Sequence, residues 1–192
     1  MNLQDDTYYI DKVLHGEVNA YTFLVDRHKR MAYTLALKIL SVPEDAEEAA
    51  QDAFVKAYQS LKDFKGESKF STWLYTIVYH LSVSRLRKKQ LKTVSIHDEH
   101  FRTFDVVDTY HFLSRITNDE QSAMVRSAIE KLSGEEQALV TLYYLNESSV
   151  KEISGITGDT ESNVKVKLFR VRKRLGELLT HHQSTKISMS HE

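Results

Sequence analysis

The chain has 192 residues, with 26 Lys and Arg against 27 Asp and Glu, so its formal net charge is −1 at pH 7 with histidine neutral. The absence of cysteine excludes disulfides, thiol nucleophiles and cysteine-based zinc sites, and no apolar run approaches the roughly 20 residues that span a bilayer. Apolar residues make up 41% of the chain, and one proline with six glycines predicts an all-α protein with short connections.

The first strong helical pattern runs from Ala20 to Ile39, where apolar residues recur at steps of three and four. Ser41-Val42-Pro43 ends this helix, and proline suits the opening turn of the next one. That next helix has an apolar face from Ala46 to Leu61. Its other face is acidic, with five acids and no base between Glu44 and Asp52. Such a face is either solvated or a docking surface for a basic protein partner.

A polar loop with two aromatic residues, Phe64 and Phe70, precedes a third predicted helix that begins after Ser71 and runs through Lys89. The helix has an apolar stripe and ends in a basic stretch, with five bases and no acid between residues 85 and 92. Aromatic residues beside cations are typical of single-strand capture, in which bases stack on rings. Trp73 and Phe70 could equally stack on bases or be buried in the hydrophobic core. Three residues that we expect off the apolar stripe fit nucleic acid better: Tyr75, Tyr79 and His80.

Periodicity is lost from residue 91 to about 120, which we interpret as a linker with some local helix. His97-Asp98-Glu99-His100 resembles a metal site in composition only, because no third ligand with fixed geometry accompanies the two histidines. No serine nucleophile elbow, phosphate-binding loop or dinucleotide motif is present. We therefore expect no metal, no cofactor and no enzymatic activity.

Helical periodicity returns in three short segments, at 124–132, 139–143 and 150–156. Thr157-Gly158-Asp159 predicts a tight turn, and Thr160 or Asp159 is expected to cap the final helix. From Glu161 to Leu175 that helix carries six Lys or Arg and one acid. Its core face consists of residues at steps of four, three and four: Val164, Leu168, Val171 and Leu175.

A basic helix that follows a short helix and a glycine turn is typical of a helix-turn-helix that docks in the major groove of a duplex. The alternative is a charged face that is only solvated and binds no partner, and the near absence of acidic residues argues against this alternative. Exposed residues at the start of the helix are best placed for base edges, and the later Arg and Lys residues suit phosphates.

Two blocks of the sequence resemble extracytoplasmic-function (ECF) sigma factors. Residues 43–54, the loop from Phe64 to Phe70, Thr72-Trp73-Leu74 and Arg85-Leu86-Arg87 resemble region 2 of that family. Residues 132–175, which end in 168–175 (Leu-Phe-Arg-Val-Arg-Lys-Arg-Leu), resemble its region 4. The chain departs from the family pattern at five positions: His80, Ser84, Ser133, Ser148 and Asp159.

The resemblance implies roles for three groups of residues. The acidic helix would dock on core RNA polymerase through Asp45, Glu48, Gln51, Asp52 and Val55. The loop and third helix would bind the minus-ten element and a flipped base through Lys62, Lys65, Lys69, Tyr75, Tyr79, His80, Arg85, Arg87 and Lys88. The last helix would read the minus-thirty-five element through Ser162, Asn163, Lys165, Val166, Lys167, Arg170, Lys173 and Arg174.

We therefore expect two small helical domains, region 2 at 1–92 and region 4 at 123–180, joined by a flexible linker at 93–122 and followed by a polar tail at 181–192. The expected function is promoter recognition and transcription initiation with core RNA polymerase, promoter DNA and an anti-sigma factor as partners, in the cytoplasm and without membrane insertion. A stand-alone helix-turn-helix regulator is the alternative, and a metal-dependent enzyme using His97 and His100 is a third.

Overall fold

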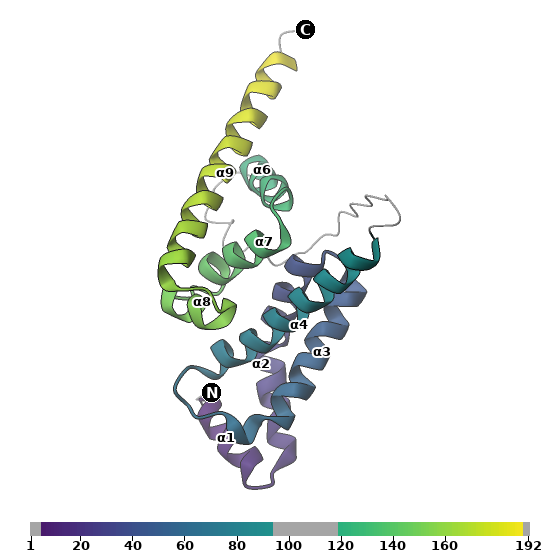
Figure 1. The fold of residues 1–192 in the computed structure, drawn as a ribbon, viewed down its shortest axis with the longest axis vertical. Coiled ribbons are helices and arrows are strands. Elements are labelled where there is room, and N and C mark those ends of the chain that lie inside the picture. The colour runs from purple at the N-terminus through teal and green to yellow at the C-terminus, as the bar shows by residue number, and fades with distance from the viewer. Residues whose placement is uncertain (1–4, 94–118, 190–192) are drawn as a thin grey trace. The chain divides into compact units, whose positions relative to one another are not determined.

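The computed structural model (Figure 1) describes residues 5–93 and 119–189, which form two compact helical units, the first made mainly of the residues before that gap and the second mainly of those after it. Every regular element in these ranges is a helix. None of the described helices is apolar over a length that could cross a membrane. The predicted linker lies largely outside the described residues, and His97 and His100 lie outside them entirely.

The first unit is a bundle whose long helices are α2 (Tyr21–Leu40), α3 (Pro43–Gln59) and α4 (Phe70–Thr93). α2 packs against both α3 and α4, which also contact each other (Figure 1). The predicted end of α2 is confirmed: Ser41 adopts a left-handed conformation with φ 59°, and its amide donates to Leu37 O. Pro43 then opens α3, where a missing amide hydrogen costs nothing. The core of the bundle includes Leu24, Leu35 and Leu74.

Two further parts of the first unit differ from the sequence prediction. A short helix, α1 (Asp6–Leu14), precedes the turn η1 (Val18–Ala20) and was not predicted. Tyr58 and Phe23, expected on apolar faces, are exposed. Each instead contacts one ring: Tyr58 packs edge-on against Tyr21, and Phe23 stacks on Tyr9 of α1. After α3 the turn η2 (Leu61–Asp63) buries Leu61 and leads into the loop before α4.

The elements that follow the gap are α6 (Asp119–Glu130), α7 (Gly134–Val140), a π-helical turn η3 (Thr141–Leu145), α8 (Val150–Thr157) and α9 (Glu161–Met189). α9 packs against α6 and α7. Ser133 caps α7 in a reciprocal box with Glu136, so the position that departs from the family pattern still starts a helix well. Ser149 and Glu152 form the same reciprocal pair at the start of α8.

The final helix has most of the predicted core face: Val164, Leu168 and Val171 are buried, and Leu175 is half-buried. It continues through Met189, although the sequence predicted a polar tail from residue 181. The reason is local, because no glycine or proline follows Gly176 to end the helix. At its beginning, Gly158 has φ +77°, a conformation that glycine adopts without strain, and this allows the tight turn between α8 and α9.

Candidate functional site

The acidic face predicted on the second helix is present on α3. Alanines recurring at three- and four-residue steps turn one side of the helix into the bundle, where Ala46, Ala49 and Ala53 are fully buried. The other side carries the residues predicted to contact a protein partner, which are exposed or half-buried: Asp45, Glu48, Gln51, Asp52 and Val55. Val55 is 56% exposed, so an apolar side chain projects at the C-terminal end of a charged surface.

The basic end of α4 lies against this acidic face and forms ion pairs with it. The Arg85 guanidinium pairs with Asp52 and, at 3.1 Å between Nη1 and Oε2, with Glu48. Lys89 Nζ lies 2.9 Å from Asp45 Oδ2. The sequence predicted one surface for a protein partner and a separate one for DNA, whereas the structure joins the two. The three carboxylates and the two cations, Arg85 and Lys89, therefore partly neutralise each other in the chain alone.

The prediction that Tyr75 and Tyr79 lie off the apolar stripe of α4 is wrong. Tyr75 is 3% exposed and Tyr79 is 7% exposed. The stripe is wider than expected, because residues adjacent to Leu74 and Val78 also turn inward on a helix packed against two others. Neither ring is available for base stacking in this structure, while His80 of the same helix is exposed.

Tyr75 belongs instead to a buried polar network that joins α1, α2 and α4. Its hydroxyl lies 3.5 Å from His28 Nδ1, and His28 Nε2 lies 2.9 Å from Asp6 Oδ2. Burial raises the pKa of the Tyr75 hydroxyl, and the nearby Asp6 charge adds to this. Burial also tends to raise the pKa of Asp6, but hydrogen bonds and charges from His28 and Arg27 outweigh it and lower that pKa overall.

The loop before α4 forms one wall of a cavity of about 530 Å³. Two of its predicted DNA-binding lysines, Lys65 and Lys69, line the cavity together with the rings of Phe64 and Phe70. Carboxylates of α1 line the other side: Asp5, Asp6 and Asp11. Lys62 is exposed and lies outside this lining. Rings, cations and hydrogen-bond acceptors therefore converge on a space large enough for a base.

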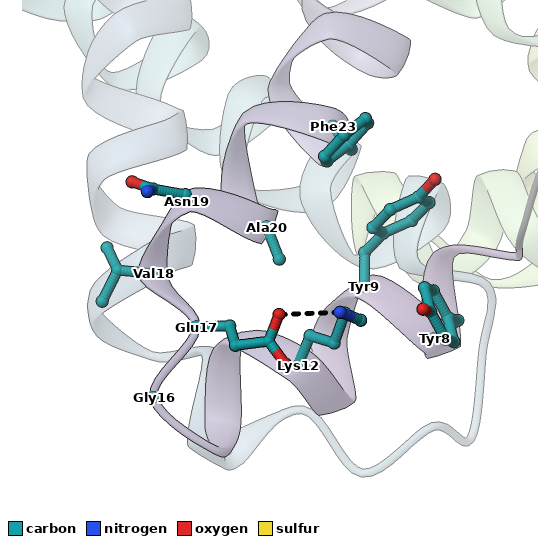
Figure 2. Close-up of a pocket in the computed structure, with 9 residues that line it drawn as sticks. All are labelled: Tyr8, Tyr9, Lys12, Gly16, Glu17, Val18, Asn19, Ala20 and Phe23. Atoms are coloured by element: carbon teal, nitrogen blue, oxygen red, sulfur yellow. Dashed lines mark hydrogen bonds and ion pairs between the residues drawn. The ribbon is translucent and has the colours of Figure 1, made fainter.

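A second cavity, of about 630 Å³, lies between α1 and the start of α2 and was not predicted from the sequence. Figure 2 shows Lys12 and Glu17 joined across it, with 2.7 Å between Nζ and Oε2. Tyr9 and Phe23 stack on its rim with ring centroids 4.6 Å apart. The Tyr8-Tyr9 pair was the sequence signal that could have pointed to an aromatic surface here.

The start of α9 presents most of the residues predicted to read base edges. Thr160 caps the helix, since its Oγ1 accepts from the Asn163 amide at 3.2 Å. Exposed side chains follow on the first turns and continue along the helix: Ser162, Asn163, Lys165, Val166, Arg170 and Lys173. Lys167 is half-buried, and its ammonium pairs with Asp159 in the turn.

Farther along α9, two bases are held by the preceding helices. Arg174, predicted to contact phosphate, pairs with Glu136 of α7 at 3.2 Å between Nη1 and Oε2. Burial tends to raise the pKa of Glu136, but hydrogen bonds from Ser133 and the Arg174 charge lower it overall. Arg172 donates to the Tyr144 hydroxyl at 2.7 Å. These contacts fix the angle between α9 and the helices before it.

The described residues contain no cluster of three or more metal-ligating side chains. The described chain presents three surfaces that can bind a partner: an acidic face with an apolar residue at one end, an aromatic cavity lined by lysines and carboxylates, and a basic helix after a tight turn.

Two family models match the chain in order, one described as Sigma-70 region 2 over residues 24–92 and one as Sigma-70, region 4 over residues 122–175. The chain is 30% identical over 183 residues to the ECF RNA polymerase sigma factor SigW of Bacillus subtilis (strain 168), which covers 88% of this chain and 94% of that protein. It is 35% identical over 141 residues to the RNA polymerase sigma factor YlaC of the same organism, covering 71% and 79%.

Solved structures show the same fold. CnrH in complex with the cytosolic domain of CnrY matches with a TM-score of 0.65 and 23% identity, covering 92% of this chain and 97% of that one. The sigma factor RpoE in complex with the anti-sigma factor NepR from Bartonella quintana matches with a TM-score of 0.60 and 21% identity, covering 83% and 97%.

Proposed function

The chain belongs to the ECF family of RNA polymerase sigma factors, and we propose that its three surfaces divide polymerase docking, promoter opening and promoter recognition between them. The protein is a transcription initiation factor that works by binding and carries out no covalent chemistry. The observation that carries this conclusion is the presence of both sigma regions in order on one chain. A stand-alone regulator would account for the second region only.

The exposed side of α3 is the docking surface for core polymerase in this proposal. Its carboxylates suit a basic partner, and exposed Val55 supplies an apolar contact at the C-terminal end of the surface. Because Arg85 and Lys89 already pair with these carboxylates, a basic polymerase surface must compete with them. Docking would then release both cations for promoter phosphates, which couples polymerase binding to DNA binding.

The cavity beside the loop at 64–71 would accept a base flipped out of the minus-ten element. Half-buried Phe64 offers a ring for stacking, and buried Phe70 packs edge-on against it from behind. Asp5 and the carboxylates of α1 can accept hydrogen bonds from the amino groups of a base. Lys65 and Lys69 are placed for the flanking phosphates. Opening the duplex costs a few kcal/mol for each unstacked step, and a captured base offsets part of that cost.

The N-terminal half of α9 would lie in the major groove of the minus-thirty-five element. Exposed Ser162, Asn163 and Lys165 are one or two turns from the cap, where recognition helices contact base edges. The exposed bases farther along the helix, Arg170 and Lys173, fit the flanking phosphates. Arg174 pairs with Glu136, so Arg174 has a structural role in addition to its predicted phosphate contact.

An anti-sigma factor is the third partner that we infer, since the sigma factor RpoE, which has the same fold, is in complex with the anti-sigma factor NepR. Such a protein would cover the same docking surfaces and keep the chain inactive. Polymerase and promoter DNA are located in the bacterial cytoplasm, so the chain would act there.

Transcription with purified core polymerase tests the proposal. Val55→Lys places a positive charge in the docking surface without removing a partner of Arg85, and we expect it to abolish promoter-specific transcripts. Gln59→Lys adds the same charge to an exposed position of α3 outside the predicted surface and should leave the transcripts in place. Equal activity of the two variants would remove the assignment of this surface.

A further inference from the structure

The turn between α8 and α9 contains a carboxylate that engages two residues of the predicted reading surface. Asp159 Oδ1 accepts from Asn163 Nδ2 at 2.7 Å, and Asp159 Oδ2 accepts from Lys167 Nζ at 2.5 Å. Asn163 and Lys167 are four residues apart, so they lie on one side of the helix. Asp159 is one of the positions at which this chain departs from the family pattern, where an apolar residue is usual.

The two oxygens of Asp159 accept from side chains of α9, while the hydroxyl of Thr160 caps the helix. Thr160 fills that role through Asn163 N. The Asp159 side chain is 20% exposed and the Lys167 side chain is 38% exposed, so the pair is partly shielded from water and salt. A short, partly shielded pair of this kind holds its geometry better than an exposed one.

We propose that Asp159 is a positioning residue that determines base specificity: it fixes the Asn163 amide with the oxygen available to DNA and withholds the Lys167 ammonium from it. This inference rests on the proposed reading of the upstream element by α9. An ionised carboxylate accepts hydrogen bonds and cannot donate them, so it must face the amide nitrogen of Asn163. The flipped amide would place two oxygen atoms against each other.

The fixed amide selects among bases. It keeps one oxygen acceptor and one remaining N–H donor, which match the N6 donor and N7 acceptor on the major-groove edge of adenine. Guanine presents two acceptors on the same edge, so the amide oxygen would repel its O6. A freely rotating asparagine has no such constraint. The geometry therefore assigns adenine to the base that faces Asn163.

Holding Lys167 has a separate consequence. A lysine ammonium is attracted by guanine O6 and N7 and by phosphates, and the Asp159 charge cancels that attraction. By pairing with Lys167, Asp159 therefore weakens a preference for guanine. It also removes the attraction of one positive charge to phosphates, which does not depend on base sequence. Selectivity increases while the total attraction to duplex DNA decreases.

Two substitutions separate the two effects. Asp159→Ala removes both contacts. Asp159→Asn carries no charge to hold Lys167, and its amide can either accept from Asn163 or, when flipped, donate to it. Glu161→Gln is the matched control, because it removes one negative charge from an exposed position in the first turn of α9 without touching either contact.

The experiment uses core polymerase reconstituted with the full-length chain and a pool of duplexes randomised over the upstream element, selected for binding and sequenced. We expect the wild type to select adenine at one position. In Asp159→Ala the preference for adenine over the other bases at that position should fall by roughly fivefold or more, while the base preferences at the other positions stay the same. Asp159→Asn should keep part of the adenine preference, because its oxygen can still accept from Asn163 but its amide no longer excludes the flipped orientation. Both variants should steepen the dependence of log affinity on log salt by roughly 0.9, the value for one added phosphate contact.

Glu161→Gln should raise affinity for all sequences about equally and leave base preference unchanged. A recovered motif that is the same for wild type and Asp159→Ala at every position would overturn the inference and leave the proposed function intact. A wild-type protein that recovers no upstream motif would instead refute the role of α9 itself. Loss of preference at all positions at once would show that Asp159 only maintains the fold.

Discussion

Replacing Arg85 with alanine tests the ion pairs that join the basic end of α4 to the acidic face of α3. Arg85 pairs with both Glu48 and Asp52, and its side chain is 27% exposed. Exposed ion pairs contribute about 0.2–1 kcal/mol each, so the two together contribute on the order of 1 kcal/mol. Arg85→Ala should lower the free energy of unfolding of the first unit by about that amount.

The same substitution should raise affinity for core polymerase. If polymerase must displace Arg85 from the two carboxylates, removing Arg85 removes the competition, and 1 kcal/mol corresponds to about a fivefold lower Kd. Fluorescence anisotropy of a labelled chain titrated with core polymerase, in the absence of DNA, measures this directly. The gain should shrink as salt is raised, because the competing pairs are screened.

A matched control removes a positive charge and an ion pair elsewhere in the same unit. Lys29 pairs with Asp26 at 2.7 Å on α2, and both side chains are more than 60% exposed, at 63% and 62%. Lys29→Ala should change polymerase affinity by less than about twofold. If Arg85→Ala binds polymerase no better than wild type, or more weakly, the competition between Arg85 and the polymerase surface is refuted.

Three further outcomes follow from the contacts described above. Ser133→Ala removes the capping box of α7 and should cost about 0.5–2 kcal/mol, seen as faster amide hydrogen exchange in α7; unchanged exchange would contradict the cap. The lowered pKa of Asp6 stabilises the first unit above the ordinary carboxyl pKa of about 4 and ceases to do so as pH falls through the folded value. The fluorescence of Trp73, the sole tryptophan, should therefore report unfolding below about pH 4. In Asp6→Asn the loss of stability with falling pH should be less steep, and parallel pH profiles for the two proteins would refute this. His80→Ala, at an exposed position, should change stability by less than about 0.5 kcal/mol yet reduce open-complex formation on a cognate promoter, and full opening would remove His80 from the minus-ten surface.

The helices with sparse, regular apolar positions were predictable from the sequence. α3 is the best example, because its alanines at three- and four-residue steps define a narrow buried stripe and leave the acids outside. The core face of α9 was predictable for the same reason. In both helices one face is strongly charged, so the period of the pattern is unambiguous.

α4 was harder, because its aromatic residues occur on several sides and its pattern does not show how wide the buried stripe is. Tyr75 and Tyr79 are buried because α4 packs against both α2 and α3, a tertiary fact that periodicity does not contain. The predicted DNA contacts of these two rings therefore have no support in the structure.

Contacts between separate elements could not be predicted from spacing at all. Arg85 pairs with Asp52 from 33 residues away, and Arg174 pairs with Glu136 from 38 residues away. The role of Asp159 could be assigned only from the structure, because the sequence allowed either Asp159 or Thr160 to cap α9. In each case the side-chain charge was evident but its partner was not.

Sequence-selective initiation is the central claim, and mapping transcript start sites on a promoter library with purified core polymerase tests it most directly. With the wild-type chain present, we expect starts at a subset of templates that share two short elements upstream, and no such starts with polymerase alone. The chain without polymerase should bind those templates weakly. Start sites that are unchanged by adding the chain, together with tight selective binding of duplex DNA by the chain alone, would contradict the account.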